Sequence, residues 1–190
     1  MSSKTMNPPE LTEYEGIRLS PLKDFPDMSV KGTQHVSLAS YRLRITGLVE
    51  RPEAYRYEEV LKQYRPQRRV VRLVCGTGWD VTILWEGLPM GELIGEANPL
   101  PVANTVIFHA CDGYTTALPL DYLVDKNILM ACKMNGLTIP PERGFPFIII
   151  AEGKQGHKWA RWITEIELSD NADYLGYWES QGYSNLADLE

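Results

Sequence analysis

Residues 68–94 read RRVVRLVCGTGWDVTILWEGLPMGELI, and this stretch does most to decide the fold. It opens on apolar, β-branched residues with arginines between them, which predicts a buried strand over residues 68–75 that ends at Cys75. Gly76 and Gly78 follow at once and predict a tight turn. Apolar residues at helical spacing after Pro89 predict a short helix, and these are Met90, Leu93, Ile94 and Ala97.

The rest of the chain has more strand-like than helix-like segments. Alternation or short apolar runs predict strands at residues 41–49, 105–110, 128–134, 145–151 and 159–168. In the last of these, alternate residues from Ala160 to Leu168 are expected to share one face. Residues 57–64 place apolar and aromatic side chains at helical spacing, which predicts a second short helix. Because βαβ alternation is absent, we expect an α+β fold with mixed or antiparallel β-sheets and short helices.

Length and charge limit the number of domains and the kind of partner. The chain of 190 residues fits one domain, which we place at residues 1–190 with an extended N-terminal tail at residues 1–15. With 25 acidic and 19 basic side chains the formal net charge is -6, so a nucleic acid partner is not expected. No run approaches the ~20 apolar residues of a membrane span. No signal peptide is visible, so we expect a cytoplasmic protein, or an extracytoplasmic one if a leader has been trimmed.

Cys75 is the first residue with candidate chemistry. The chain has three cysteines without a CxxC pair and three histidines without an HExxH, so neither a disulfide framework nor a zinc hydrolase is indicated. A thiolate is a soft metal ligand that nearby cations favour, and the cations close by in the sequence are Arg65, Arg68, Arg69 and Arg72. Alternatively, Cys75 is a small core residue and the arginines form a solvated face. The pattern leaves both interpretations open.

Two further segments carry possible chemistry. Residues 109–114 read HACDGY, in which Asp112 and Gly113 predict a turn that presents Tyr114. Residues 153–162 read GKQGHKWARW and combine cations with large aromatic side chains. This pattern suits anion capture, but it equally fits a strand with one cationic face. A thiol hydrolase that uses Cys75 or Cys111 with a histidine is a further alternative that no spacing supports.

A resemblance to a known family is carried by several segments in a fixed order. They are YRLRITGLVERP (41–52), VCGTGWDVTILWEGLPMGELI (74–94), VIFHACDGYTTALPLDYL (106–123), ILMACKMNGLTIPPERGFPFIII (128–150), GHKWARWITEIEL (156–168) and YWESQGY (177–183). In this order they resemble the sulfite oxidase-like molybdopterin-binding oxidoreductase family, in its small, single-domain form. The resemblance covers roughly residues 15–185 and implies the molybdopterin-binding domain fold of that family.

The resemblance implies a molybdenum–molybdopterin cofactor and roles for individual residues. Cys75 would bind the metal through its thiolate, and Tyr114 would be the catalytic residue that faces the substrate. The implied cofactor-binding residues are Cys75, Ala110, Arg143, Lys158, Trp159, Ala160 and Arg161. The implied function is two-electron oxygen-atom transfer to or from a small S- or N-centred substrate, with a separate electron-transfer protein as partner.

Several positions depart from the family pattern. Val74 stands where some relatives carry His or Asn, Ala110 replaces a threonine, and Ile148 replaces an arginine. These departures motivate an alternative function, a non-catalytic molybdopterin-binding protein on the same scaffold. Sulfite is not the expected substrate, because the arginines that bind it in sulfite oxidases have no match here. The aromatic residues near the C-terminus either pack on the domain or dock a redox partner, and they are Tyr174, Tyr177, Trp178 and Tyr183.

Overall fold

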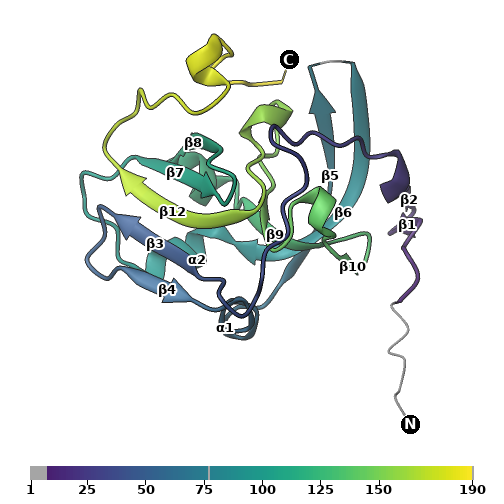
Figure 1. Cartoon of the computed structure of the whole chain (residues 1–190), viewed down its shortest axis with the longest axis horizontal. Coiled ribbons are helices and arrows are strands. Elements are labelled where there is room, and N and C mark those ends of the chain that lie inside the picture. The colour runs from purple at the N-terminus through teal and green to yellow at the C-terminus, as the bar shows by residue number, and fades with distance from the viewer. Residues whose placement is uncertain (1–7, 77, 190) are drawn as a thin grey trace.

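Two five-stranded β-sheets form the body of the molecule (Figure 1). The computed structural model describes residues 8–76 and 78–189. The first sheet has the order β10-β9-β6-β5, with β11 paired to β9. Its strands are β5 (Gln67–Cys75), β6 (Trp79–Pro89), β9 (Leu129–Met134), β10 (Leu137–Thr138) and β11 (Ile148–Ile149). The second sheet has the order β4-β3-β12-β7-β8, made of β3 (Leu43–Gly47), β4 (Glu53–Tyr55), β7 (Thr105–Ala110), β8 (Thr115–Pro119) and β12 (Ile163–Ser169).

The helices between these strands are short. The α-helices of the described residues are α1 (Tyr57–Gln63), α2 (Met90–Glu96) and α3 (Leu120–Asp125). The 3-10 turns are η1 (Leu22–Asp24), η2 (Pro141–Arg143), η3 (Gly156–Lys158) and η4 (Glu179–Gln181). Within residues 8–76 and 78–189, no helix has both the length and the apolar character needed to cross a membrane.

The β5–β6 hairpin extends from the first sheet beyond the neighbouring strands (Figure 1). The two strands are antiparallel along their whole length, and Cys75 pairs with Trp79 at the tip. β6 also pairs with β9, where a bulge falls between Glu86 and Gly87. Gly87 is needed at this bulge, because a Cβ there would lie 2.3 Å from the carbonyl oxygen of Met130. The hairpin therefore holds Cys75 at one end of the sheet.

β12 is the central strand of the second sheet. It runs parallel to β3 and antiparallel to β7, and its apolar residues Ile166 and Leu168 are fully buried. The inward faces of β3 and β7 add Ile45 and Phe108 to the same core, and β6 adds Trp85. Each such side chain contributes about 1.5–3 kcal/mol when it is fully buried. The core thus fixes the ends of β5, β7 and β12, from which the loops of the site begin.

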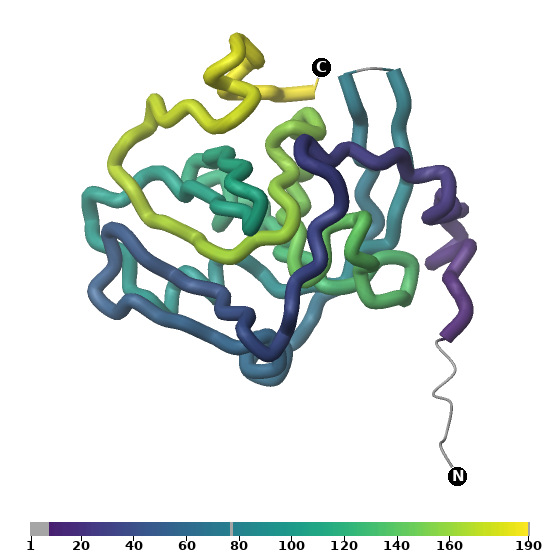
Figure 2. Tube along the Cα trace, viewed as in Figure 1, coloured from purple at the N-terminus to yellow at the C-terminus, as the bar shows by residue number. Residues whose placement is uncertain are grey.

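The N-terminal segment lies against the first sheet before it enters β3. β1 (Glu13–Tyr14) and β2 (Ile17–Arg18) form a small hairpin. The amide of Leu11 donates to the carbonyl of Asn135 at 2.9 Å, and that of Ser20 to the carbonyl of Thr82 at 2.8 Å. Figure 2 shows the chain passing beside the β5–β6 hairpin and then descending toward β3. Residues 1–7 of the predicted tail lie outside the described residues.

Most predicted elements are confirmed. The strand at residues 105–110 matches β7, and those at 68–75 and 128–134 match β5 and β9 within one residue. The helices predicted at 57–64 and after Pro89 are α1 and α2. The strand at 41–49 is shorter than predicted, because β3 spans Leu43–Gly47. The α+β fold class with mixed sheets is therefore correct.

Two predicted strands are wrong in extent. Of residues 145–151 only Ile148 and Ile149 form a strand, and Pro146 just before them has no N–H to donate to a neighbour. The strand predicted at 159–168 begins only at Ile163, because Trp162 has a φ of 49°, a left-handed conformation that interrupts a strand. The single face expected from Ala160 to Leu168 is interrupted at the same residue. We predicted no element for β6, β8 or α3.

Candidate active site

A cavity of about 910 Å³ opens between segments that are far apart in the sequence. Its walls come from the N-terminal lead-in, the β5–β6 hairpin, the β7–β8 turn, the loop before β12 and the C-terminal segment. The lining includes Asp27, Cys75, Trp79, Tyr114, His157, Trp159, Arg161, Trp162, Tyr177, Trp178 and Tyr183. A volume of this size is typical of cavities that bind cofactors and small substrates.

Cys75 lines this cavity from the end of β5. Its side chain is half-buried, and its carbonyl accepts a hydrogen bond of 3.0 Å from the amide of Gly78. Gly78 has a φ of 91°, so the hairpin turns sharply just beyond the cysteine. The structure therefore places the thiol at a cavity wall, the position that a ligand for a bound metal requires.

Tyr114 lines the cavity from the turn between β7 and β8. The Asp112 carboxylate accepts a 2.9 Å hydrogen bond from the Tyr114 amide, and Gly113 has a φ of 85°, as the predicted turn requires. The Tyr114 hydroxyl donates to the carbonyl of His157. Burial raises the pKa of Tyr114, and the charge of Glu179 raises it further. The phenol therefore stays protonated near neutral pH.

Arg161 is the cation of the cavity wall. It is only 7% exposed, and its guanidinium carbon lies 5.4 Å from the centre of the Phe25 ring. The guanidinium carbon of Arg143 lies 5.2 Å from the same ring. Burial and the neighbouring charge of Arg143 lower the pKa of Arg161 to about 10, so it is charged at neutral pH. A Cβ on Gly144, which has a φ of 119°, would lie 2.8 Å from the Arg161 Cβ, so this close approach depends on glycine.

Both arginines keep a donor without a partner. The Nη1 atoms of Arg143 and Arg161 are buried, and no atom of the described residues accepts a hydrogen bond from them. A buried donor without an acceptor costs free energy. A bound ligand that supplies an acceptor would remove this cost at both arginines. Asp27 is the carboxylate close to them. The Ser29 amide and, to a smaller degree, both arginines lower its pKa.

Trp159, Ala160 and Ala110 differ in what they offer to the cavity. Trp159 lines it, with its indole N–H donating to the Lys154 carbonyl at 3.1 Å and its ring 6.0 Å from that of Trp85. Ala160 and Ala110 are buried, and their backbone groups are used within the protein. The Ala160 carbonyl accepts from Ile149, and the Ala110 amide donates to the carbonyl of Tyr114. Trp159 is thus the member of this group that faces the cavity.

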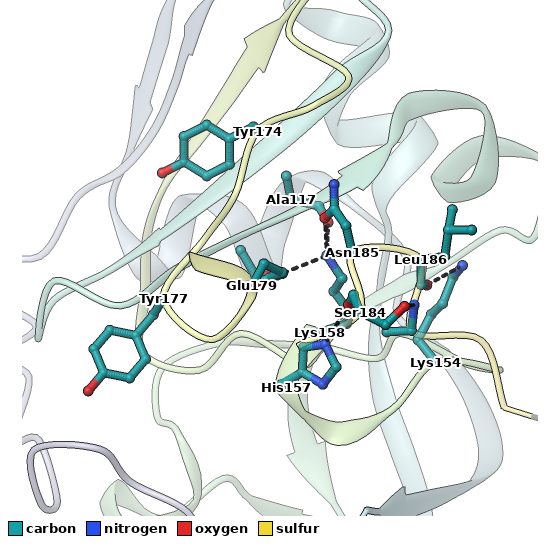
Figure 3. A network of polar contacts seen from close by, with 12 residues as sticks. Ala117, Lys154, His157, Lys158, Tyr174, Tyr177, Glu179, Ser184, Asn185 and Leu186 are labelled. Carbon is teal, nitrogen blue, oxygen red and sulfur yellow. Dashed lines mark hydrogen bonds and ion pairs between the residues drawn. The ribbon is translucent and has the colours of Figure 1, made fainter. Parts of the chain in front are cut away.

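Lys158 is buried and does not line the cavity, and its ammonium points toward Glu179, Asn185 and Ala117 (Figure 3). Its ammonium donates to Glu179 Oε1 at 2.5 Å, to Asn185 Oδ1 at 2.9 Å and to the carbonyl of Ala117 at 3.1 Å. These contacts use all the N–H groups of an ammonium. Burial lowers the pKa of Lys158, while Glu179 raises it. In this structure Lys158 binds the C-terminal segment, whereas the resemblance implies a cofactor contact for it.

The arginine cluster before Cys75 lies outside the cavity. Arg68 pairs with Glu86 and Arg72 with Asp80, each at 2.7 Å, and both arginines are exposed. The solvated-face interpretation of this cluster is therefore correct. Of the two histidines considered for a thiol hydrolase, His109 pairs with Glu167 on the second sheet, while His157 lines the cavity with Cys75 and its Nε2 contacts the carbonyl of Ser184.

The donors around the cavity fit a soft metal held with an anionic organic group. Cys75 offers a sulfur ligand, Arg161 offers an unused N–H group, and the indoles of Trp79 and Trp159 offer flat apolar surface, while Arg143 does not line the cavity but keeps an unused N–H group on the same Phe25 ring as Arg161. This is the donor set that a molybdenum–molybdopterin cofactor requires. Sequence reasoning missed Phe25, which supports both arginines from the lead-in. No periodicity marks it, because its role arises only from long-range packing.

Comparisons with known proteins indicate the same cofactor as this donor set. Residues 29–178 match the family described as the oxidoreductase molybdopterin binding domain. The uncharacterized oxidoreductase YuiH of Bacillus subtilis (strain 168) is 30% identical over 152 residues, which are 80% of this chain and 76% of YuiH. MsrP of Gluconobacter oxydans (strain 621H), a protein-methionine-sulfoxide reductase catalytic subunit, is 30% identical over 148 residues, 69% of this chain and 47% of MsrP.

Longer relatives and one solved structure extend the comparison. The NADPH nitrate reductase of Aspergillus niger is 28% identical over 159 residues, 70% of this chain and 18% of that enzyme. This chain thus spans most of YuiH but less than half of MsrP and of the nitrate reductase. The sulfane dehydrogenase SoxCD from Paracoccus pantotrophus shares the fold, with a TM-score of 0.69 over 73% of this chain and 40% of that chain at 21% identity. Since the family match covers most of the sequence, the chain belongs to the sulfite oxidase-like oxidoreductase molybdopterin-binding family and is a molybdopterin-dependent oxidoreductase.

Proposed function

We propose that this protein catalyses two-electron oxygen-atom transfer to or from a small S- or N-centred substrate. One observation carries the proposal: the cavity that Cys75 lines is also lined by Arg161, whose buried Nη1 finds no acceptor within residues 8–76 and 78–189. The names of two relatives support the substrate class, since one is a nitrate reductase and the other a methionine sulfoxide reductase subunit. The cofactor, when bound, supplies the redox change and the oxygen-transfer chemistry.

The residues of this chain bind, orient and shield. The Cys75 thiolate would hold the metal, and Arg161 and Arg143 would donate their unused N–H groups to the anionic part of the cofactor. Tyr114 presents a protonated phenol whose position is fixed by its bond to the carbonyl of His157. Trp159 and Trp79 add apolar walls that exclude water from the cavity.

The overall reaction balances with an external electron carrier. In the reductive direction an S-oxide takes up two electrons and two protons and leaves as the sulfide and water. In the oxidative direction the same atoms and electrons move the opposite way. We assign the electrons to a separate electron-transfer protein, and the name of MsrP as a catalytic subunit supports a partner of this kind.

Metal and pterin analysis combined with turnover tests the proposal. Protein expressed with molybdate should contain about one molybdenum per chain and release a fluorescent pterin on denaturation. A dye-coupled assay that screens S-oxides, N-oxides and sulfite should detect turnover of dimethyl sulfoxide or trimethylamine N-oxide. Cys75→Ser should lose molybdenum and activity, while Cys111→Ser, at an exposed cysteine, should keep both. Bound pterin without turnover of any substrate would favour the non-catalytic alternative, and absence of molybdenum would refute both.

A further inference from the structure

The C-terminal segment, residues 174–189, follows β12 in yellow in Figure 1, and we call it the C-terminal strap because three of its residues line the cavity. The family match ends at residue 178, so most of the strap lies beyond the part of the sequence that matches the family. Its residues Tyr177, Trp178 and Tyr183 nevertheless line the cavity. Tyr177 and Trp178 lie at the end of the family match and Tyr183 lies beyond it, so the strap extends the wall of the cavity past the end of the match.

The beginning of the strap is fixed to β8. The Tyr174 hydroxyl donates to Thr115 Oγ1 at 3.0 Å, and the Tyr177 amide donates to the Thr115 carbonyl at 2.8 Å. A Cβ on Gly176 would lie only 2.2 Å from the same carbonyl oxygen. Glycine at this position thus lets the strap lie directly against the edge of the second sheet.

A buried ion pair fixes the middle of the strap (Figure 3). Glu179 Oε1 accepts from Lys158 at 2.5 Å and from Thr116 Oγ1 at 2.6 Å, and the side chains of both ionised residues are fully buried. Lys158 also holds Asn185 of the strap. Because breaking a buried ion pair leaves an uncompensated charge, this contact strongly disfavours release of the strap.

The end of the strap is fixed to the loop before β12. Lys154 donates to the Leu186 carbonyl at 2.8 Å and to Asp188 Oδ1 at 2.6 Å. The Gln155 amide donates to the Ala187 carbonyl at 2.8 Å, and Nε2 of His157 lies 3.0 Å from the Ser184 carbonyl oxygen. The loop that supplies His157, Trp159 and Arg161 to the cavity therefore also holds the strap.

Between these attachments the strap presents a continuous row of rings. The Tyr177 ring lies 5.8 Å from that of Tyr114 and 5.2 Å from that of Trp178. The Trp178 ring lies 5.0 Å from that of Tyr183, which lies 5.5 Å from the ring of His157. Tyr183 is 51% exposed and stands at the mouth of the cavity. We call Tyr177, Trp178 and Tyr183 the aromatic wall.

We propose that the aromatic wall determines substrate specificity by binding an aromatic or apolar substituent next to the reacting S or N atom. The inference rests on the proposed function. Its three residues carry rings without formal charge and begin beside Tyr114, so they offer stacking surface next to the site of reaction. The buried pair Lys158 and Glu179 holds them in place, so the wall recognises shape without first having to be ordered.

Two S-oxides that differ only in one substituent test the inference on the holoprotein. Methyl phenyl sulfoxide should have a lower KM than dimethyl sulfoxide. Trp178→Ala should raise the KM for the phenyl compound about tenfold more than the KM for the methyl compound, because ring contacts of this kind carry roughly that factor. Tyr183→Ala, at a half-exposed residue, should act in the same direction. Leu175→Ala removes an exposed apolar side chain of the strap that does not line the cavity, and it should leave the ratio of the two KM values as in the wild type.

Calorimetric binding of the same two sulfoxides separates this inference from the proposed function. If the holoprotein turns over neither sulfoxide nor any other substrate of the dye-coupled assay, the proposed function fails, and binding of the two sulfoxides alone then decides the role of the wall. Tighter binding of the phenyl compound that is lost in Trp178→Ala and Tyr183→Ala supports the wall. If each substitution changed the KM and the binding of the phenyl and the methyl compound by the same factor, the proposed role of the aromatic wall would be overturned.

Discussion

Arg161 is a charged residue that is almost fully buried in the protein. Its guanidinium carbon and that of Arg143 lie 5.4 and 5.2 Å from the centre of the Phe25 ring, and the buried Nη1 atom of each has no acceptor among the described residues. Burial of the Arg161 charge costs free energy in the cofactor-free protein, and the neighbouring charge of Arg143 adds to this cost. An anionic group in the cavity removes this cost, because it supplies both an acceptor and an opposite charge.

Arg161→Gln should therefore separate cofactor binding from stability. We expect pterin retention to weaken about 10- to 100-fold, since a hydrogen bond to a charged group is worth about 1.5–3 kcal/mol. The free energy of unfolding of the cofactor-free protein should not fall, because the substitution removes a desolvated charge. Pterin fluorescence after dialysis and urea unfolding measure the two effects. Arg72→Gln, which breaks an exposed pair with Asp80, is the control and should retain the pterin. Wild-type retention in Arg161→Gln would contradict this role.

Two glycines allow a matched test of backbone strain. Gly144→Ala should destabilise the protein by roughly 1–3 kcal/mol, because φ is 119° there and the new Cβ would lie 2.8 Å from the Arg161 Cβ. Gly95→Ala in α2 should stabilise it by about 0.5–1 kcal/mol, because no atom lies within 4 Å of a Cβ there and alanine favours a helix. Urea unfolding measures both. Equal effects at the two positions would show that the close approach of Gly144 to Arg161 does not matter.

At the scale of elements, the strands with a regular pattern were predictable and those without one were not. β7 and β5 combine β-branched residues with clear boundaries, and both were predicted within one residue. β6 was missed because nearly all of its residues are buried, from Val81 to Pro89, so it has no alternation between apolar and polar residues. The strand predicted at residues 159–168 was too long at its start. Its apolar pattern includes Trp162, but the left-handed φ of that residue interrupts the extended backbone.

Glu86 links three strands of the first sheet. It lies on β6 and pairs with Arg68 of β5 at 2.7 Å and with Lys133 of β9 at 2.9 Å. Burial alone would raise the pKa of its carboxyl, but hydrogen bonds and charges from Lys133 and Arg68 outweigh burial and lower the pKa below its usual 4.5. The carboxylate thus contributes stability that is fully present above pH 4.5 and is lost as the pH falls through the lowered pKa.

Glu86→Gln should make this contribution measurable. We expect a loss of about 1 kcal/mol at pH 7, modest because both cationic partners are about half exposed. The difference between wild type and variant should shrink progressively as the pH is lowered below 4.5, since the wild-type carboxylate then becomes neutral as well. Urea unfolding across this range measures the difference. A difference that stays constant with pH would mean that the side chain acts through packing and not through its charge.

At the scale of the whole molecule, the site is made by segments that no local pattern connects. The resemblance pointed to Cys75 and Tyr114, and the structure places both at one cavity. It also implied a cofactor contact for Lys158, whose ammonium is fully used by Glu179, Asn185 and Ala117. The difference arises because the partners of Lys158 in the strap lie more than twenty residues away in sequence.

Because the walls of the cavity run from residue 26 to residue 183, a bound cofactor would connect both sheets with both ends of the chain. The cofactor should therefore stabilise the whole molecule.

At a concentration 100 times its Kd, a ligand adds about 2.7 kcal/mol to the free energy of unfolding. For a chain of this size that corresponds to roughly 5–10 °C in Tm. Calorimetry of holoprotein and of protein expressed without molybdate measures the shift, and Cys75→Ser should show the lower Tm under both conditions. Limited proteolysis should cut the lead-in of the cofactor-free form before any strand, because this segment loses the group that it would enclose, whereas Lys158 and Glu179 still hold the strap. Equal Tm values and equal cleavage patterns would mean that the cavity is fully ordered without a cofactor, and that the charge of Arg161 at its wall is stabilised by the protein alone.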